Sequence, residues 1–282
     1  MYRDDLLKGR HILITGGGTG LGKAMALRFA ELGAKVSITG RRAEPLKETV
    51  EEIRAKKGAA FETTCDVRNF EAVEKMVEEC EKAQGPIDTL VNNAAGNFIA
   101  RTEKLSANAF NAVVGIVLQG SFYCTLVMGR KWIAAKKPGN VLSISTTYAS
   151  SGSGSGYVVP SACAKAGVLA MTRSLAVEWA RYKIRLNAIA PGPFPTQGAF
   201  SRLLPSAELE ERAKNGNPMK RFGRSEELAN LAVYLVSTES EYVNGECVVI
   251  DGGEWLKGAG EFNMFGDLSE EGWQELEKAK KK

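Results

Sequence analysis

The sequence predicts an α/β fold with one doubly wound parallel sheet of about seven strands and helices on both faces. Short apolar runs alternate with longer amphipathic segments along most of the chain, a pattern typical of strands joined by right-handed helical crossovers. The 282 residues are 44% hydrophobic, which is enough for one full core. Because the composition does not shift along the chain, we expect residues 1–282 to form a single domain.

Seven short apolar runs are the expected strands. Helices cover both faces of such a sheet, so its strands are continuous apolar runs rather than strict alternations. The runs are residues 11–15, 35–39, 59–64, 88–91, 141–144, 184–190 and 247–250.

The segments between these runs supply the expected helices, which are residues 23–32, 71–83, 110–135, 162–181 and 226–237, with a further helix after Arg42. Residues 196–217 combine Gly, Pro and charged residues, and we expect a helical lid over the substrate there. The tail, residues 254–282, is amphipathic only at its end. Two placements stay open for it, on the lid or on a neighbouring subunit.

Composition and charge argue against several classes of function. The net charge of +4 comes without a basic stripe, which favours anionic ligands over nucleic acid. Five scattered cysteines without a CxxC pair argue against disulfides and zinc and favour a reducing compartment such as the cytoplasm. The single histidine, His11, starts a strand and is expected to be structural, so we expect no metal site.

No membrane segment is expected either. The first strand begins within about ten residues, which is too soon for a signal peptide. We expect no apolar run to be long enough to span a bilayer.

A glycine-rich turn joins the first strand to the first helix. Glycines let backbone N–H groups approach a pyrophosphate, and the helix N-terminus adds positive potential. Because a strand and a helix flank the turn as required, cofactor binding is favoured over an ordinary turn. The expected cofactor-binding residues here are Gly16, Gly17, Gly18, Thr19, Gly20, Leu21 and Gly22.

Two arginines, Arg41 and Arg42, follow the second strand. An NAD-selective site usually has an acidic residue there, whereas guanidinium groups suit a phosphate, so the pair favours NADPH. The alternative is a solvated pair at the start of the next helix. Asp66, after the third strand, is positioned to accept from an adenine amine or to cap the helix that follows Asn69.

Three segments in order resemble the short-chain dehydrogenase/reductase family. They are residues 15–22 (Thr-Gly-x-x-x-Gly-x-Gly), residues 92–96 (Asn-Asn-Ala-x-Gly) and the dipeptide Pro191–Gly192. The resemblance implies a single Rossmann-like domain, a nicotinamide cofactor and a dimer or tetramer. It also implies that Asn93, Lys165, Pro191 and Gly192 contribute to the cofactor site.

The sequence departs from the usual pattern of that family. Most members have Tyr four residues before the active-site Lys, but Ser161 stands four residues before Lys165, and Val117 stands where the usual Asn falls. Three interpretations are open. Catalysis is lost and the chain is a non-catalytic NADP-binding protein, Tyr157 replaces the usual tyrosine, or another tyrosine reaches the site from a different backbone position.

The third interpretation is favoured because the chain resembles the 2,4-dienoyl-CoA reductase branch. The resemblance lies in residues 93–98, 146–148, 158–165, 191–202 and 260–263. It implies that Tyr148 is the catalytic tyrosine, that Asn97 binds the thioester carbonyl with it, and that Lys165 binds the nicotinamide ribose with Ser161 in support. The implied substrate-binding residues are Arg68, Phe98, Ser106 and Arg202.

The expected function is therefore NADPH-dependent reduction of 2,4-dienoyl-CoA thioesters to enoyl-CoA, an auxiliary reaction of fatty acid β-oxidation. Hydride addition to a dienoyl thioester moves negative charge to the thioester oxygen, which a tyrosine O–H and an asparagine N–H stabilise. Reduction of a carbonyl, in a 3-oxoacyl thioester or a ketone, is the alternative within the family. The expected partners are an acyl-CoA thioester and further copies of the chain in a homo-tetramer.

Overall fold

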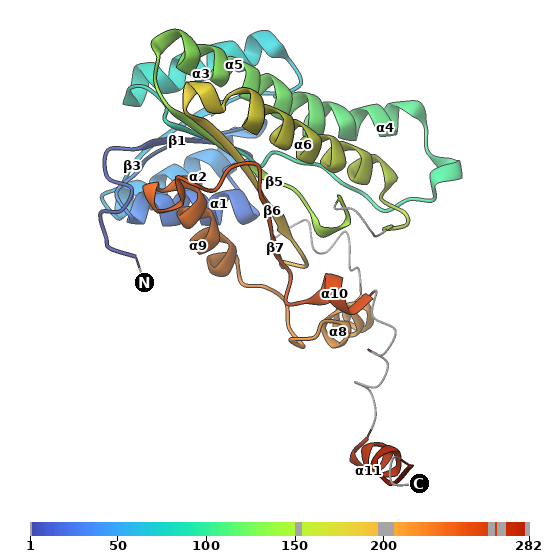
Figure 1. Ribbon diagram of the computed structural model, residues 1–282. Helices are drawn as coiled ribbons and strands as arrows, with labels where there is room; N and C mark the ends of the chain where they lie inside the picture. The colour runs from blue at the N-terminus through green and yellow to red at the C-terminus, as the bar shows by residue number, and fades with distance from the viewer. Residues whose placement is uncertain (1, 150–153, 197–205, 259–262, 264–268, 280–282) are drawn as a thin grey trace.

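The computed structural model describes residues 2–149, 154–196, 206–258, 263 and 269–279. Its centre is a seven-stranded sheet in the order β3-β2-β1-β4-β5-β6-β7, and every neighbouring pair is parallel (Figure 1). The α/β prediction is confirmed. The strands are β1 (His11–Thr15), β2 (Lys35–Gly40), β3 (Ala59–Thr64), β4 (Thr89–Asn92), β5 (Gly139–Ile144), β6 (Ile184–Pro191) and β7 (Cys247–Ile250).

Helices pack on both faces of this sheet, as predicted. Two large buried clusters, one on each face, join α1, α2 and α9 to one side and α3, α5 and α6 to the other (Figure 1). The helices are α1 (Gly20–Glu31), α2 (Ala43–Ala55), α3 (Phe70–Gln84), α4 (Ala107–Val114), α5 (Gly120–Ala135), α6 (Val159–Glu178), α8 (Ala207–Gly216), α9 (Ser225–Val236), α10 (Glu254–Gly258) and α11 (Glu270–Ala279).

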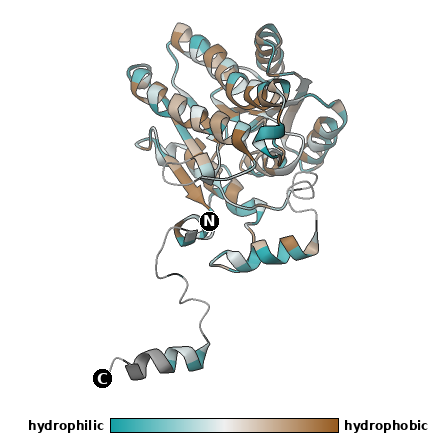
Figure 2. Cartoon of the chain, turned by 90° about the vertical axis from the view of Figure 1, so that its right-hand side faces the viewer, coloured by the Kyte–Doolittle hydropathy of each residue, from teal (hydrophilic) through white to brown (hydrophobic). Residues whose placement is uncertain are grey.

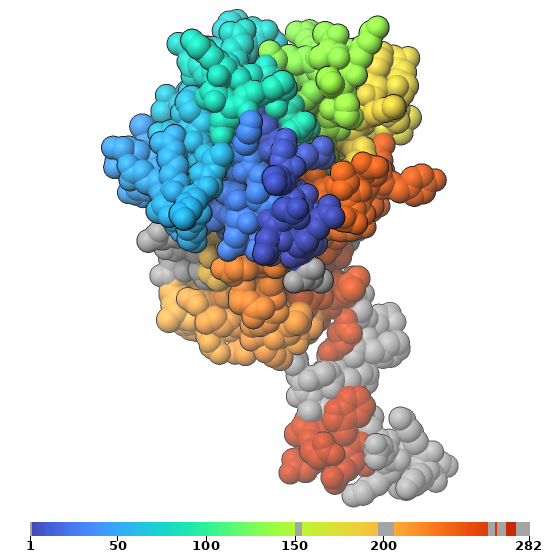
Figure 3. Space-filling model, turned by 90° about the vertical axis from the view of Figure 1, so that its left-hand side faces the viewer, coloured from blue at the N-terminus to red at the C-terminus, as the bar shows by residue number. Residues whose placement is uncertain are grey.

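The first strand is anchored by the one histidine. His11 is buried, with Nδ1 2.7 Å from the Gly85 carbonyl and Nε2 2.8 Å from the Ser37 hydroxyl. Burial lowers the pKa of His11, which favours the neutral ring. The structural role predicted for His11 is therefore confirmed. The amino-terminal segment before it lies against α9 in Figure 3, where the Tyr2 hydroxyl donates to the Asn230 carbonyl at 3.0 Å.

The segment predicted as one helix over residues 110–135 begins at Ala107, where the Ser106 hydroxyl accepts from the Ala109 N–H at 3.1 Å. A π-helical turn, Gly115–Gln119, separates α4 from α5 without breaking the helix. An 18-residue window of the continuous helix Ala107–Ala135 has a mean hydropathy of 1.7, so the helix is long and apolar enough to cross a bilayer. The expectation that no such run exists was therefore wrong. This helix packs beside α3 and α6 in the core, which accounts for its apolarity.

The carboxyl-terminal part lies beyond the end of the sheet. The Asn217 amide, just after α8, donates to the Asp251 carbonyl at 2.7 Å, so α8 is tied to the segment that leads into α10. Helix α8 covers half of the predicted lid, and residues 197–205 lie outside the described residues. Helix α11 lies apart from the sheet domain (Figures 1 and 2).

Candidate active site

The glycine-rich turn leads directly from β1 into the first turn of α1. Gly16 and Gly20 have φ angles of +67° and +55°, which residues with a Cβ rarely adopt. A Cβ at Gly22 would lie 2.2 Å from the Gly16 carbonyl oxygen, so the turn has no room for a larger residue. Thr19 is the N-cap of α1 but makes no side-chain cap bond, so the amide groups of the first turn stay available to an anion.

Asn93 holds this turn in place. Its side-chain N–H group donates to the carbonyl oxygens of Thr15 and Gly16, both at 3.0 Å. The Thr15 hydroxyl in turn accepts from the backbone N–H groups of Asn93 and Ala94 at 3.0 Å. Asn93 therefore joins the end of β4 to the cofactor turn, and its predicted part in the cofactor site is consistent with a positioning role.

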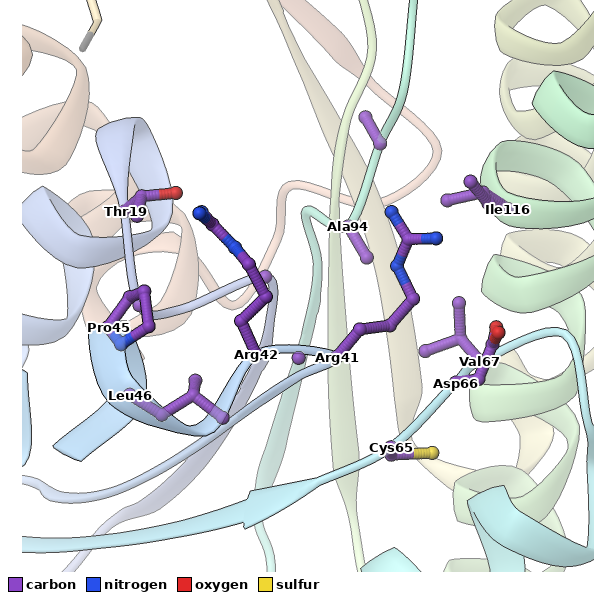
Figure 4. Close-up of a pocket in the computed structure, with 14 residues that line it drawn as sticks. Thr19, Arg41, Arg42, Pro45, Leu46, Cys65, Asp66, Val67, Ala94 and Ile116 are labelled. Carbon is purple, nitrogen blue, oxygen red and sulfur yellow. The ribbon is translucent and has the colours of Figure 1, made fainter. Parts of the chain in front are cut away.

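A cavity of about 310 Å³ opens between the glycine-rich turn and the carboxyl ends of β2, β3 and β4 (Figure 4). Arg41 and Arg42 extend into it from the end of β2, with Arg42 reaching toward Thr19 and Arg41 toward Val67 and Ile116 (Figure 4). Neither guanidinium has an ion-pair partner within the described residues. Open backbone amides and two free cations fit a dinucleotide that carries an additional phosphate.

Asp66 lines the same cavity and binds Arg68. The Arg68 guanidinium donates to both carboxylate oxygens, at 2.9 Å to Oδ1 and 2.5 Å to Oδ2, and this bond lowers the pKa of Asp66. The helix-cap alternative for Asp66 is wrong, because Asn69 caps α3 with its own side chain. The structure thus places Arg68 beside the cofactor cavity, and its predicted contact with substrate stays a prediction.

A second polar cluster lies at the ends of β4 and β5. The Tyr148 hydroxyl, on a 3₁₀ turn just after β5, is 3.0 Å from the Ser161 hydroxyl and accepts from the Asn97 amide at 3.3 Å. The Asn97 side-chain oxygen accepts from the Phe98 N–H at 2.9 Å, which orients the amide nitrogen toward Tyr148. Two donors therefore converge at one point, the arrangement needed to bind an oxygen that becomes negative.

Lys165 lies one helical turn after Ser161, at the start of α6. Its side chain is 8% exposed, and the ammonium group donates to the carbonyl of Ile144 at the end of β5. Burial lowers the pKa of Lys165 to about 8, because the charged form loses its hydration. The lysine is held between α6 and the sheet on the same side as Tyr148.

The interpretation in which Tyr157 replaces the usual tyrosine receives no support from the geometry. Tyr157 has 63% of its surface exposed, and its hydroxyl has no hydrogen-bond partner within the described residues. Val117 is 1% exposed and packs with Val113 and Ala164, so an apolar contact stands where the resemblance expects an amide. The tyrosine that meets Ser161 is Tyr148.

The remaining predicted residues lie around these two clusters. Phe98 packs, partly buried, on the apolar cluster between α4 and α6, and Ser106 is occupied as the cap of α4. Pro191 ends β6, and Gly192 donates to the Ile250 carbonyl at 3.0 Å, close to the end of β7. Arg202 lies outside the described residues.

Several cavity residues were missed by the sequence reasoning. The chief ones follow β3 and β4 or lie on the π-helical turn, and they are Cys65, Val67, Ala94, Ala95 and Ile116. Their common signal is position, since the carboxyl ends of parallel strands meet at one edge of the sheet. Thr196 was also missed, and its side chain lies 3.2 Å from where a Cβ on Gly20 would stand.

Comparison with known proteins decides the family. The family model described as Enoyl-(Acyl carrier protein) reductase matches residues 16–254. The crystal structure of a short chain dehydrogenase from Bacillus anthracis aligns over 87% of this chain and 96% of its own, at 46% identity and a TM-score of 0.79. This chain is a short-chain dehydrogenase/reductase. The family members are oxidoreductases with a nicotinamide cofactor. The glycine-rich turn and the cavity described above have the features that such a cofactor needs.

Within the short-chain dehydrogenase/reductases, several similar proteins are named 2,4-dienoyl-CoA reductases. A protein of Bacillus subtilis, "Probable 2,4-dienoyl-CoA reductase [(2E)-enoyl-CoA-producing]", is 49% identical over 87% of this chain and 96% of its own. A "Probable 2,4-dienoyl-CoA reductase 3 [(3E)-enoyl-CoA-producing]" of Caenorhabditis elegans is 44% identical over 90% of this chain and 83% of its own. A gluconate 5-dehydrogenase from Burkholderia cenocepacia, solved with NADP and tartrate, aligns at 31% identity and a TM-score of 0.82, over 89% and 97%.

Proposed function

We propose that this oxidoreductase uses NADPH to reduce 2,4-dienoyl-CoA thioesters to enoyl-CoA thioesters. The observation that carries the proposal is the polar cluster around the Tyr148 hydroxyl, which lies 3.0 Å from the Ser161 hydroxyl and 3.3 Å from the Asn97 amide nitrogen. Relatives at 49% and 44% identity bear the name of this activity. The tyrosine reaches the cluster from the turn after β5 and not from α6.

The proposed mechanism depends on charge movement within the substrate. NADPH, when bound, supplies the hydride. As hydride adds to the diene, negative charge accumulates on the thioester oxygen, where Tyr148 and Asn97 donate hydrogen bonds. Ser161 keeps the Tyr148 hydroxyl directed at this oxygen. A proton from solvent then adds to carbon and completes the enoyl product.

Lys165 has two parts in this proposal. Its ammonium group binds the hydroxyls of the nicotinamide ribose, and its positive charge polarises the Tyr148 O–H toward the developing oxyanion. Burial lowers the pKa of Lys165 to about 8, so the charged form still predominates at neutral pH.

Preference for NADPH is proposed from Arg41 and Arg42. Both guanidinium groups line the cavity at the end of β2, and no acidic side chain stands beside the ribose end of the turn in residues 40–42. A 2′-phosphate between them would receive charge-assisted hydrogen bonds from two directions.

The reaction is tested by NADPH oxidation with purified protein and 2,4-hexadienoyl-CoA, beside acetoacetyl-CoA and NADH controls. We expect fast oxidation with the dienoyl ester and NADPH alone. Oxidation with acetoacetyl-CoA alone would instead indicate a carbonyl reductase. Analysis of the product decides between 2-enoyl and 3-enoyl thioesters, a point on which the names of the relatives differ.

The oxygen-binding pair is tested in the same assay. Removal of one such donor lowers kcat by roughly 10²–10³-fold, so we expect a loss of this size in Tyr148→Phe and a further loss in the double variant with Asn97→Ala. Tyr242→Phe is the matched control, since it removes a fully exposed tyrosine hydroxyl outside the cluster. Full turnover in the double variant would contradict the assignment.

The assembly and location are also proposals. Phe110, Phe122 and Val177 expose apolar side chains on α4, α5 and α6, which favours contact with further copies in a homo-tetramer. Each of the five cysteines, all within the described residues, is a free thiol. Free thiols suit a reducing compartment, and we propose the cytoplasm.

A further inference from the structure

Two exposed apolar side chains flank the polar cluster. Ile99 comes two residues after Asn97 and is 53% exposed, and Tyr157 comes four residues before Ser161 and is 63% exposed. Single exposed apolar side chains are common on protein surfaces, but these two are close in sequence to the cluster, where contact with a ligand would bury their apolar area. Ile99 and Tyr157 are thus close in sequence to Asn97 and Ser161, which belong to the proposed thioester site.

A backbone hydrogen bond joins the two loops that carry Ile99 and Tyr157. The Ala100 N–H donates to the Tyr157 carbonyl at 2.9 Å and so joins the loop after β4 to the loop before α6. Both loops lie at the same end of the α4–α6 pair (Figure 1). This hydrogen bond between the loops restricts the movement of Ile99 and Tyr157 relative to each other.

The backbone of Tyr157 is unusual. Its φ is +66°, a left-handed conformation that is unfavourable for residues other than Gly, Asn and Asp. Strained residues of this kind persist when surrounding structure holds them, and they concentrate at ligand sites. Here the strain accompanies an aromatic ring that is presented to solvent, so core packing does not explain the choice of tyrosine.

An apolar path connects this feature with the carbonyl site. Phe98, between Asn97 and Ile99, packs on the buried cluster of Val113, Val117 and Ala164 between α4 and α6. Asn97, Phe98 and Ile99 are consecutive, so an acyl chain that leaves a carbonyl group bound by Asn97 starts next to this apolar segment.

We propose that Ile99 and Tyr157 form an acyl lip, an apolar edge that covers the part of the substrate's acyl chain beyond the diene and favours longer chains. The proposal rests on the proposed dienoyl-CoA reduction. The lip supplies contact area and not chemistry, so its removal leaves short substrates unaffected. Each additional methylene is worth roughly fourfold in affinity when fully buried.

The lip is tested by kcat/KM for 2,4-hexadienoyl-CoA and 2,4-decadienoyl-CoA at saturating NADPH. We expect Tyr157→Asn and Tyr157→Gly, which suit a positive φ, to lower the decadienoyl to hexadienoyl ratio by about fivefold or more. The value for hexadienoyl-CoA should change less than about twofold, since the diene itself lies at the carbonyl site. Ile99→Ala should lower the ratio in the same direction.

Two control variants test whether the aromatic ring of Tyr157 is responsible for the chain-length preference. Tyr157→Phe keeps the aromatic surface and should keep the chain-length ratio. Tyr242→Asn alters a tyrosine that is fully exposed on the segment before β7, away from the cluster, and should also keep it. An equal loss for both substrates in Tyr157→Asn, or an unchanged ratio, would overturn the lip.

Binding separates this proposal from the reaction. The dissociation constants of decanoyl-CoA and hexanoyl-CoA, measured calorimetrically with NADP⁺ present, need no turnover. If the wild type reduces neither dienoyl ester but Tyr157→Asn still weakens decanoyl-CoA selectively, the lip stands and the dienoyl reaction fails. If the wild type reduces both esters and no variant alters either ratio, the reaction stands and the lip fails.

Discussion

At the scale of single residues, the tyrosine beside Ser161 stands at a different position in the sequence from the tyrosine of most family members. Ser161 stands one helical turn before Lys165, and the tyrosine hydroxyl arrives beside it from Tyr148, 13 residues earlier. The sequence resemblance predicts this pairing, and the structure adds the distances, 3.0 Å to Ser161 and 3.3 Å to Asn97. An oxyanion site depends on where its hydrogen-bond donors lie in space. Here the tyrosine hydroxyl comes from the turn after β5 and not from α6.

Cofactor preference is a residue-scale prediction. Removal of the guanidinium groups in Arg41→Ala with Arg42→Ala should raise KM for NADPH by roughly 10²–10⁴-fold, since each of the two charge-assisted bonds to a phosphate contributes about 1.5–3 kcal/mol. KM for NADH should stay within about twofold, because NADH lacks the 2′-phosphate. Steady-state kinetics with both cofactors measures the effect, and an equal rise for both would identify the arginines as structural.

Lys165 makes stability depend on pH. Burial lowers its pKa from 10.5 to about 8, so between these values the unfolded chain binds more protons than the folded chain. Lys165 should therefore contribute a rise of about 2–3 kcal/mol to the free energy of unfolding of the cofactor-free protein between pH 8 and pH 10. The thiols of Cys65, Cys80 and Cys247, whose pKa values burial raises, contribute in the opposite direction over the same range. Below about pH 7 the Lys165 contribution is constant.

Lys165→Met provides the comparison for that prediction. It removes the titrating group, keeps a long apolar side chain and leaves the thiols unchanged. The free energy of unfolding of the wild type minus that of the variant should therefore rise between pH 8 and pH 10 by about 2–3 kcal/mol. Urea unfolding at pH 8, 9 and 10 measures both. Parallel pH profiles would show that another group accounts for the dependence.

At the scale of secondary-structure elements, close approach decides which residues are tolerated. Gly129 of α5 faces Trp179, just beyond the end of α6, and a Cβ at position 129 would lie 2.3 Å from the indole ring. Trp179 is 7% exposed and so has little room to move. The glycine is therefore required by the packing of α5 against α6.

Gly129→Ala should accordingly destabilise the protein by about 1–3 kcal/mol, the usual range for an overpacked core. Gly216→Ala, at the end of α8, is the matched control, because nothing lies within 4 Å of a Cβ at that position. Urea unfolding of both variants measures the difference. Equal stability of the two would mean that Trp179 moves aside freely.

At the scale of the whole molecule, the two faces of the sheet have different surroundings. Helices α4, α5 and α6 expose apolar side chains on one side, and Val177 of α6 is 82% exposed. If this face contacts another copy, Val177→Glu should lower the mass measured by light scattering toward the 30.4 kDa of one chain. Tyr242→Glu, on the segment before β7, should leave the mass unchanged. A wild-type protein that is already monomeric would contradict the proposed tetramer.

The sequence by itself determined the parallel sheet, the cofactor turn and the family, because apolar runs, glycine spacing and helix periodicity are local properties. It also placed the ends of most elements within a few residues. The contact between Asn97 and Tyr148, 51 residues apart, came only from the tertiary structure, because it depends on β4 lying next to β5. The pairing of Arg68 with Asp66, two residues apart, depends on the conformation of the loop after β3, which periodicity along the chain does not encode.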